Sequence, residues 1–310
     1  MTSRQTSVSF VAAAAITLTA IMLYDVMGAI VKHLSQDYPA PQLAMFRNLF
    51  ALVPTVLVLI WSQTWRQAGR PIVIRRWKLA LARGGIGTLA QVSFYLALAR
   101  LEFATATAIV FAGPLFVTAL SIPVLGHRVG PWRWASVLIG FAGVMLVMQP
   151  TAEGFSWVAV LPLCAALGYA TNSVTAKLFD ETVPTALINL YQVSACLVGA
   201  ALLVLFSGDF VPIENLQDWL WLIGMGLAGG LAVYCLVSAY RLADPSSLSP
   251  FEYFAIPFSF CLGWIFFGET PFDRLIPGVF LIVGGGLAIT WREHRLAKRR
   301  HVSLTEGDMR

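Results

Sequence analysis

The stretch from Ser246 to Glu269 is an apolar run long enough to cross a lipid bilayer, because about 20 helical residues span a hydrocarbon core of ~30 Å. The run carries an acid, Glu252, near its start and a proline, Pro257, in its interior. A charge and a missing helix hydrogen bond are costly in lipid, so both are expected where protein or a water-filled cavity surrounds them. An earlier run, Ala104–Arg128, repeats this layout with Pro114. The pattern predicts two related helices that line a shared cavity.

Apolar runs of similar length fill most of the chain, and the composition agrees with them. Of the 310 residues, 58% are hydrophobic and 12% are charged, whereas soluble domains carry roughly 25% charged residues. The sequence therefore predicts an all-α polytopic membrane protein whose first partner is the lipid bilayer. The net charge of +5 does not indicate nucleic-acid binding, because the basic residues lie in loops and at the C-terminus, where they anchor on anionic lipid.

Ten membrane spans are predicted, joined by short connections that leave little room for an extramembrane domain. The expected spans are Phe10–Val31, Gln42–Trp61, Leu79–Leu98, Thr105–Leu125, Trp132–Met148, Trp157–Ala176, Thr185–Phe206, Trp219–Ala239, Leu248–Phe267 and Leu275–Trp291. Lys and Arg concentrate in the connections after the second and fourth spans and in the segment after the tenth. Because positively charged loops stay in the cytoplasm, both termini are expected there, with the protein in the bacterial inner membrane.

The second half of the chain repeats the order of conspicuous residues in the first half. The matching positions are Lys32 with Lys177, Pro39 with Pro184, Arg100 with Arg241, Pro114 with Pro257 and Gly126 with Gly268. Five spans in each half invert the second copy relative to the first, an arrangement common in secondary transporters. We therefore expect two inverted-topology five-helix repeats, residues 1–150 and 151–295, and a cytoplasmic basic and polar tail over residues 296–310.

The chain resembles the EamA-type ten-helix permeases of the drug/metabolite transporter superfamily. The most specific match is Leu248-Ser249-Pro250-Phe251-Glu252-Tyr253, Pro257 and Phe267-Gly268-Glu269, followed by a glycine-rich last helix. The first half departs at Gly126-His127, where the family often has Gly-Glu. The resemblance implies a bundle in which helices 1–4 and 6–9 surround a central cavity and helices 5 and 10 are peripheral. It also implies carriage of small organic metabolites, often export of amino acids or related compounds.

Asp25 and Arg47 are charged residues inside predicted spans. Both lie roughly 9–10 Å below the same membrane face at 1.5 Å rise per residue. Pairing would offset much of the cost of burying either charge alone. The functional interpretation is an outer-half site for the carboxylate or amine of a substrate. The structural alternative is an ion pair that locks the first two helices together.

Glu252 lies about one turn inside the cytoplasmic end of the ninth span, near the depth of Arg83 and Lys177. It is interpreted either as a gating or proton-coupled carboxylate, since burial and nearby cations both shift a carboxyl pKa, or as an interfacial acid that faces water or pairs with a cation. Proton coupling of a small-molecule substrate therefore stays open. The oligomeric state is expected to be a monomer or a weak homodimer.

Polar and aromatic residues inside the spans are further candidates for substrate binding or gating, because pockets combine aromatic surface with a few hydrogen-bonding groups. Two of the pairs are spaced to share a helix face. The alternative for each is a helix–helix hydrogen bond. The candidates are Gln91 with Tyr95, Tyr169 with Asn172, and Tyr234, Tyr253 and Trp264.

Four residues are expected to shape helix packing or bending. Gly226 and Gly230 form a GxxxG pair, which lets two helices approach closely. Pro114 and Pro257 are hinge candidates within their spans. The four cysteines lie in apolar runs and the four histidines lie at span ends or in the tail, so no metal and no cofactor are expected.

The sequence favours a secondary transporter that moves a small organic metabolite by alternating access. Amino acids, amines and vitamin-like aromatic compounds are the expected substrates, with export favoured. The alternative is an importer of the same fold for a riboflavin-like or other cofactor precursor. An intramembrane enzyme would need a clustered acid, histidine or nucleophile set, which the spans lack, and a non-transporting scaffold would not need the interior prolines and charges. The prediction is therefore that the chain is not an enzyme.

Overall fold

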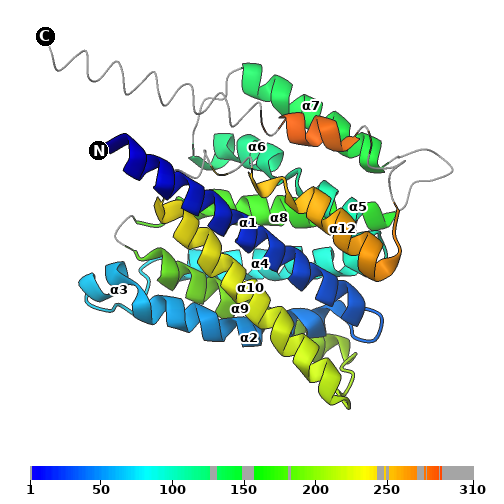
Figure 1. Cartoon of the computed structure of the whole chain (residues 1–310). Helices are drawn as coiled ribbons and strands as arrows, with labels where there is room; N and C mark the ends of the chain where they lie inside the picture. The colour runs from blue at the N-terminus through cyan, green and yellow to red at the C-terminus, as the bar shows by residue number, and fades with distance from the viewer. Residues whose placement is uncertain are drawn as a thin grey trace, which may run out of the picture.

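In the computed structural model of the chain, the described residues are 2–125, 131–148, 157–180, 183–242, 248, 251–270, 276, 278–285 and 287. These ranges form helices joined by short connections and contain no strand (Figure 1). The prediction of an all-α fold is confirmed for this part of the chain. The expected polar tail, residues 296–310, lies outside the described residues.

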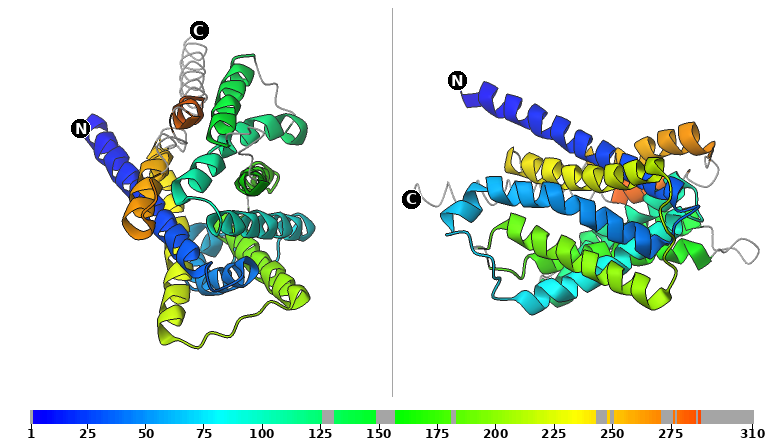
Figure 2. Two further views of the ribbon diagram at one scale, coloured as in Figure 1. Left: turned by 90° about the vertical axis from the view of Figure 1, so that its right-hand side faces the viewer. Right: turned by 90° about the horizontal axis from the view of Figure 1, so that it is seen from below.

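The helices follow one another along the chain with few long connections. They are α1 (Thr2–Leu34), α2 (Ala40–Trp61), α3 (Gln63–Gln67), α4 (Trp77–Leu98), α5 (Phe103–Val110), α6 (Gly113–Leu125), α7 (Pro131–Met148), η1 (Trp157–Ala159), α8 (Val160–Ala176), α9 (Thr185–Ser207), α10 (Leu216–Leu242) and α12 (Ala255–Phe267). Residues 278–285 form a further helical segment. The rotated views show the longer helices as one bundle of inclined rods (Figure 2).

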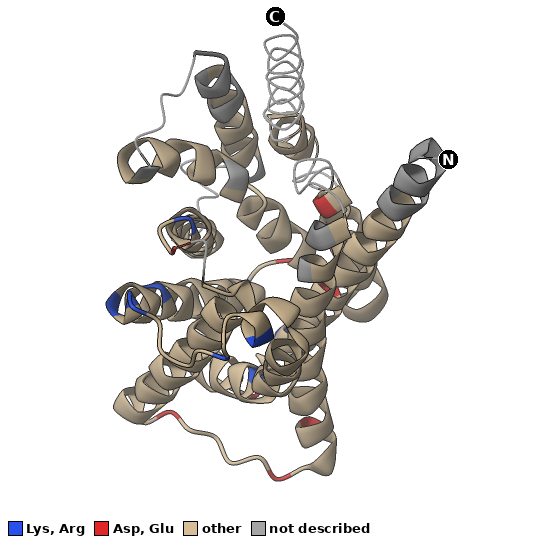
Figure 3. Ribbon diagram, turned by 90° about the vertical axis from the view of Figure 1, so that its left-hand side faces the viewer, with Lys and Arg blue, Asp and Glu red and all other residues tan. Residues whose placement is uncertain are grey.

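Six segments are long and apolar enough to cross a membrane by length and composition. They are Val11–Leu34, Ala40–Trp61, Phe103–Val124, Trp157–Ala176, Thr185–Ser207 and Leu216–Leu236. Helix α12 is apolar but shorter. Long stretches of helix carry no charge, as Figure 3 shows. These segments support a polytopic membrane protein, while the count of ten spans and the repeat remain predictions.

Two predicted spans are broken near their prolines rather than continuous. The expected span Thr105–Leu125 divides into α5, which ends at Val110, and α6, which starts at Gly113. Pro114 therefore lies in the first turn of α6. A proline cannot bond to the carbonyl four residues earlier and its ring clashes with that carbonyl. For Pro114 that residue is Val110, the last residue of α5.

The expected span Leu248–Phe267 is interrupted in the same way. Residues 253 and 254 form a turn and α12 starts at Ala255, so Pro257 lies in its first turn. Tyr253 is the residue four positions before Pro257. The rings of Phe111 and Tyr253, one from each break, are in contact with centroids 5.9 Å apart. The two interrupted helices therefore touch at the points where each loses its regular hydrogen bonding.

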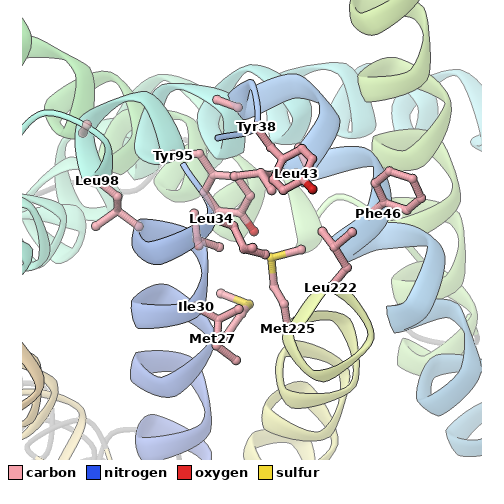
Figure 4. Packing of buried hydrophobic residues seen from close by; sticks show 14 of the residues in the cluster. Met27, Ile30, Leu34, Tyr38, Leu43, Phe46, Tyr95, Leu98, Leu222 and Met225 are labelled. Carbon is pink, nitrogen blue, oxygen red and sulfur yellow. The ribbon is translucent and has the colours of Figure 1, made fainter. Parts of the chain in front are cut away.

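The bundle is built from close helix pairs. Helix α1 packs on α10, α4 on α8, and α2 on α9 and α10. A Cβ atom added at Gly230 would lie 2.1 Å from Cγ of Pro54, and one at Gly226 would lie 2.3 Å from Cβ of Phe50. The two glycines are therefore the places where α10 touches α2. A buried apolar cluster fills the junction of α1, α2, α4 and α10 (Figure 4).

Helix α7 and the segment 278–285 lie together at one edge of the bundle (Figure 1). A Cβ atom added at Gly143 would lie 2.6 Å from the carbonyl oxygen of Gly278, so the two backbones are in direct contact. The position agrees with the peripheral placement expected for helices 5 and 10. Neither segment contributes to the wall of the central cavity described next.

Candidate functional site

A cavity of about 660 Å³ lies in the middle of the bundle. Its wall comes from α1, α2, α4, α5, α8, α9, α10 and the segment around the start of α12. Along α4 the wall extends from Tyr95 to Arg83, which is about 18 Å at 1.5 Å per residue. Both helix breaks reach it, through Phe111 on one side and Glu252 and Ala255 on the other.

The cavity collects the buried polar atoms that have no protein partner. Within the described residues, every buried side-chain nitrogen or oxygen without a hydrogen bond belongs to a cavity-lining residue. These atoms are Asp25 Oδ2, Arg47 Nε, Arg83 Nε, Thr107 Oγ1, Asn172 Oδ1 and Gln192 Oε1. Buried polar groups are normally paired, so these unpaired atoms distinguish the cavity wall from the rest of the described interior.

Arg47 is oriented by a chain of side-chain hydrogen bonds. Its Nη1 donates to Asn48 Oδ1 (2.9 Å), Asn48 Nδ2 donates to Gln91 Oε1 (2.8 Å), and Gln91 Nε2 donates to Tyr95 Oη (3.0 Å). Asn48, Gln91 and Tyr95 are buried. This series of hydrogen bonds holds the Arg47 side chain in the cavity wall. Its Nε atom has no hydrogen-bond partner.

Asp25 is 5% exposed and lines the same cavity. The ion pair expected between Asp25 and Arg47 is not formed: within the described ranges no salt bridge joins them, and Asp25 Oδ2 has no partner. Similar depth in the bundle is therefore not sufficient for contact, because the rotation of each helix also decides where a side chain points. The prediction of a structural ion pair locking α1 to α2 is wrong for this structure.

Arg83 lies toward the opposite end of the cavity. Its Nη2 donates to the carbonyl of Asn172 (3.0 Å), and its guanidinium lies 5.3 Å from the ring centroid of Phe179. Gln192 on α9 donates to the carbonyl of Arg83 (3.2 Å). These contacts connect α4 to α8 and α9 and hold the arginine in the cavity wall.

The structure brings most of the predicted site residues together. The cavity is lined by Asp25, Arg47, Gln91, Tyr95, Tyr169, Asn172 and Glu252. Three candidates lie elsewhere. Tyr234 lines a separate small pocket beside α2 and α9, and Tyr253 packs on Phe111. Trp264 is 59% exposed on the outer face of α12. Its position deep in the predicted span suggested a pocket residue, but its side chain points away from the cavity.

Beyond one end of the cavity, a partly buried ion pair ties the two halves of the chain together. Lys32 Nζ lies 2.8 Å from Glu269 Oε1, with the side chains 12% and 14% exposed. Lys32 also donates to the carbonyls of Leu98 and Leu101. The N–H of Phe103 donates to Glu269 Oε2 (2.7 Å). We call this group, Lys32 and Glu269 with their backbone partners, the Lys32–Glu269 latch.

The latch lies at the end of the cavity marked by Gly28 and Phe103. Both residues line the cavity, Lys32 is one helical turn beyond Gly28, and Phe103 itself bonds to Glu269. A Cβ atom on Gly28 would approach the Phe103 ring to 2.9 Å. The ends of α1, α4 and α12 and the start of α5 are therefore held together above the cavity.

Glu269 reaches Lys32 because Gly268 ends α12 with a left-handed turn. Gly268 has φ 65°, its N–H donates to the carbonyl of Trp264, and the N–H of Glu269 donates to that of Gly263. The bond from Gly268 to Trp264 is that of the αL cap, in which glycine adopts positive φ without strain. The Phe267-Gly268-Glu269 pattern thus has a structural reason: glycine turns the chain and the acid closes the latch.

Several lining residues were not among the predicted site residues. Asn48, Thr107 and Ser173 line the cavity, and Glu269 completes the latch. Glu269 could have been found from the sequence, since a lysine at the end of the first span needs a nearby acid. Asn48 carried no such signal, because an asparagine beside an arginine is common. Within the described residues, no group of three His, Cys, Asp or Glu could hold a metal ion.

A bundle of apolar helices around a mainly apolar cavity with a few polar and charged side chains is typical of an integral membrane protein that binds a small molecule. The comparison with known families gives the particular class. The profile of the EamA-like transporter family matches residues 11–149 and again residues 156–291. The chain belongs to this family of the drug/metabolite transporter superfamily, and it is a transporter rather than an enzyme.

Relatives of known function carry different compounds. A riboflavin transporter of Rhizobium johnstonii is 32% identical and the match covers 71% of this chain and 72% of that protein. A pseudopaline exporter of Pseudomonas aeruginosa is 27% identical, with 89% and 94% covered. An S-adenosylmethionine uptake transporter of Rickettsia bellii is 24% identical, with 89% and 91% covered. A crystal structure with TM-score 0.61 and 23% identity covers 92% of this chain and 98% of its own and shows the same fold.

Proposed function

We propose that this protein is a secondary transporter that carries a small organic metabolite across the bacterial inner membrane by alternating access. The observation that carries the proposal is the central cavity, which is lined by residues from both halves of the chain, with the Lys32–Glu269 latch beyond the end marked by Gly28 and Phe103. Its volume of about 660 Å³ is in the range of pockets that enclose small molecules, about 300–1,000 Å³.

An inverted repeat supports this mechanism. If α1 corresponds to α8, α2 to α9 and α4 to α10, exchanging the halves turns the α1–α10 contact into the α8–α4 contact. It also turns the α2–α10 contact into the α9–α4 contact and leaves α2–α9 unchanged. All of these pairs pack together, and the family profile matches each half once. Two such halves, residues 1–150 and 151–295, can rock around a fixed central site.

The interrupted helices support the same proposal. Discontinuous helices are typical of transporter binding sites, because non-helical backbone is tolerated only where protein or a cavity surrounds it. Both breaks reach the cavity wall, and Phe111 and Tyr253 contact each other there. With both termini in the cytoplasm, the latch lies at the outer face, and the structure corresponds to a state closed to the outside.

Export of amino acids, amines or aromatic metabolites remains the favoured direction from the family resemblance. Import is the second candidate, because relatives are named as riboflavin and S-adenosylmethionine transporters. Glu252 in the cavity wall is the candidate for proton coupling. The direction of transport follows from the sign of the gradient that drives substrate flux. Flux measurements on one preparation of oriented vesicles therefore decide between export and import.

The test is saturable flux in proteoliposomes loaded with radiolabelled riboflavin, S-adenosylmethionine or amino acids. The proposal predicts counterflow of at least one compound, reduced several-fold in Glu269→Gln and partly restored when Lys32→Glu and Glu269→Lys are combined. Glu214→Gln, which alters an exposed loop acid, is the matched control and should transport normally. Absence of saturable flux for every compound, with correctly folded protein, contradicts the proposal.

A further inference from the structure

We propose that the central cavity binds an amphoteric metabolite, which carries an anionic group that Arg47 receives and a cationic group that Asp25 receives. The inference rests on the proposed transport function for the fate of the ligand, but it concerns the chemistry of binding. The observation behind it is that an acid, Asp25, and an arginine, Arg47, line one cavity without pairing with each other.

Arg47 has the features of a prepared anion site. Its guanidinium is fixed by Asn48 and keeps Nε without a protein partner. It also lies against Gly229 of α10, where an added Cβ atom would lie 3.0 Å from Nε. Within the described residues no acid lies within ion-pair distance of it. Nε is buried in the contact with Gly229, so a ligand would reach the rest of the guanidinium, which lines the cavity. A guanidinium held in place in a cavity wall is suited to a carboxylate or phosphate oxygen.

Asp25 is the complementary group. It is 5% exposed, and Oδ2 has no hydrogen-bond partner in the described part of the chain. Asp25 is two residues before Met27. The sulfur of Met27 and the guanidinium of Arg47 both lie against Gly229 of α10. The level of Asp25 and Arg47 along the bundle axis is therefore similar, and the cavity lining shows that both face the same space. A ligand in the cavity can meet both.

The two other charged residues of the wall do not fit this role as well. Arg83 is about 12 Å from the level of Gln91 along α4, and it is already bonded to the Asn172 carbonyl and stacked on Phe179. Glu252 lines the cavity and has an interaction of its own. We therefore assign the ligand charges to Asp25 and Arg47 alone.

A neutral ligand would fill the space but would not compensate the charges. A buried acid and a buried guanidinium without ion-pair partners in the protein are each stabilised by a ligand group of the opposite charge. A ligand of one sign would compensate only one of them. An amphoteric ligand compensates both, so it is favoured over a neutral aromatic compound of equal size.

The first experiment is a thermal-shift series on the purified full-length protein in detergent. The amphoteric probes are tryptophan, arginine and S-adenosylmethionine, and the neutral probes are riboflavin, adenosine and tryptophol. Binding to the folded state raises Tm. We expect concentration-dependent shifts from amphoteric probes and none from neutral ones. A series in which no amphoteric probe raises Tm, or in which only neutral probes do, overturns the inference.

The second experiment assigns each charge, by using analogues of whichever amphoteric probe binds. For tryptophan these are tryptamine, which keeps the cation, and indole-3-propionate, which keeps the anion. Asp25→Asn should weaken binding of the cation-bearing analogue about tenfold or more and spare the other, and Arg47→Gln should do the reverse, since a hydrogen bond to a charged group contributes about 1.5–3 kcal/mol. Equal loss of both analogues in each variant indicates a structural role and overturns the assignment.

These outcomes are separable from the transport proposal. Charge-dependent binding without saturable flux would leave the ligand class in place and remove the transport function. Flux of riboflavin that is unchanged in Asp25→Asn and Arg47→Gln would support transport and remove the ligand class. The Tm of each variant without ligand serves as the control for folding.

Discussion

Asn48 is the residue that fixes the direction of Arg47. It accepts from Arg47 and donates to Gln91, and it is 1% exposed. Its side chain therefore joins α2 to α4 inside the cavity wall. A charged group that must meet a ligand needs such support, because a freely rotating arginine would lose side-chain entropy on binding.

We predict that Asn48→Ala weakens substrate binding more than it slows turnover. Loss of the amide leaves Arg47 unsupported and Gln91 Oε1 without its donor, at a cost of about 1–3 kcal/mol. The expected result in concentration-dependent flux is a KM raised about tenfold with kcat changed much less. Thr171→Val, which removes a hydroxyl bonded only to its own helix on an exposed face, should leave both constants unchanged. An unchanged KM in Asn48→Ala would remove Asn48 from the site.

For single residues, the sequence predicted which charged side chains line the cavity, but it did not predict which side chains contact each other. Asp25 and Arg47 stand out because ionisable residues are rare in membrane spans, and both line the cavity. Their pairing could not be predicted, since residue counting gives depth along a helix and not rotation about its axis. The same limit explains Trp264, which has the depth of a pocket residue but lies on the exposed face.

Helices α2 and α10 approach so closely that only glycine fits between them at two points. We predict that Gly230→Ala lowers the Tm of the purified protein, because the new methyl group would overlap Pro54 and overpacking costs about 1–3 kcal/mol. Gly224→Ala is the matched control on the same helix, since a Cβ atom there meets open space. The control should be neutral or stabilising by up to about 1 kcal/mol. Equal Tm values for the two variants would contradict close packing at Gly230.

The break before α12 is predicted to act as a bending point during transport. Pro257→Ala restores the backbone N–H and lets α12 extend toward Tyr253, which stiffens the contact with Phe111. We expect flux to fall several-fold while Tm is unchanged or higher. Pro123→Ala, inside α6 on an exposed face, should leave flux unchanged. Normal flux in Pro257→Ala would show that the bend is not used.

The elements themselves were largely predictable, because apolar runs bounded by Pro, Gly and charged residues mark helix ends. The interruptions were not. Pro114 and Pro257 were expected inside continuous spans, whereas α6 and α12 each begin just before their proline. The prolines are visible in the sequence, but they do not show where the helices are interrupted. The contact between Phe111 and Tyr253 shows that the two interruptions lie next to each other.

For the whole molecule, the proposed alternating-access mechanism makes the structure, in which the Lys32–Glu269 latch is formed, one end state of a two-state cycle. In the proposed repeat, Lys177 is the counterpart of Lys32, and α6 and α8 are the counterparts of α12 and α1. Helices α6 and α8 already pack on each other in this structure, so we propose that the opposite state closes their ends further and separates the ends of α1 and α12. The Lys32–Glu269 ion pair is partly shielded from water. It favours the state in which it is formed over the other state, provided that the pair breaks in the other state.

The most direct test of this account is a pair of distances measured by double electron–electron resonance in the reconstituted protein. One pair of spin labels is placed at Gln36 and Thr270, beside the latch, and the other at Val124 and Lys177, at the opposite end. With Glu269→Gln, the account predicts that the Gln36–Thr270 distance shifts to longer values while the Val124–Lys177 distance shortens. Distances that stay the same, or that lengthen together at both ends, would contradict it.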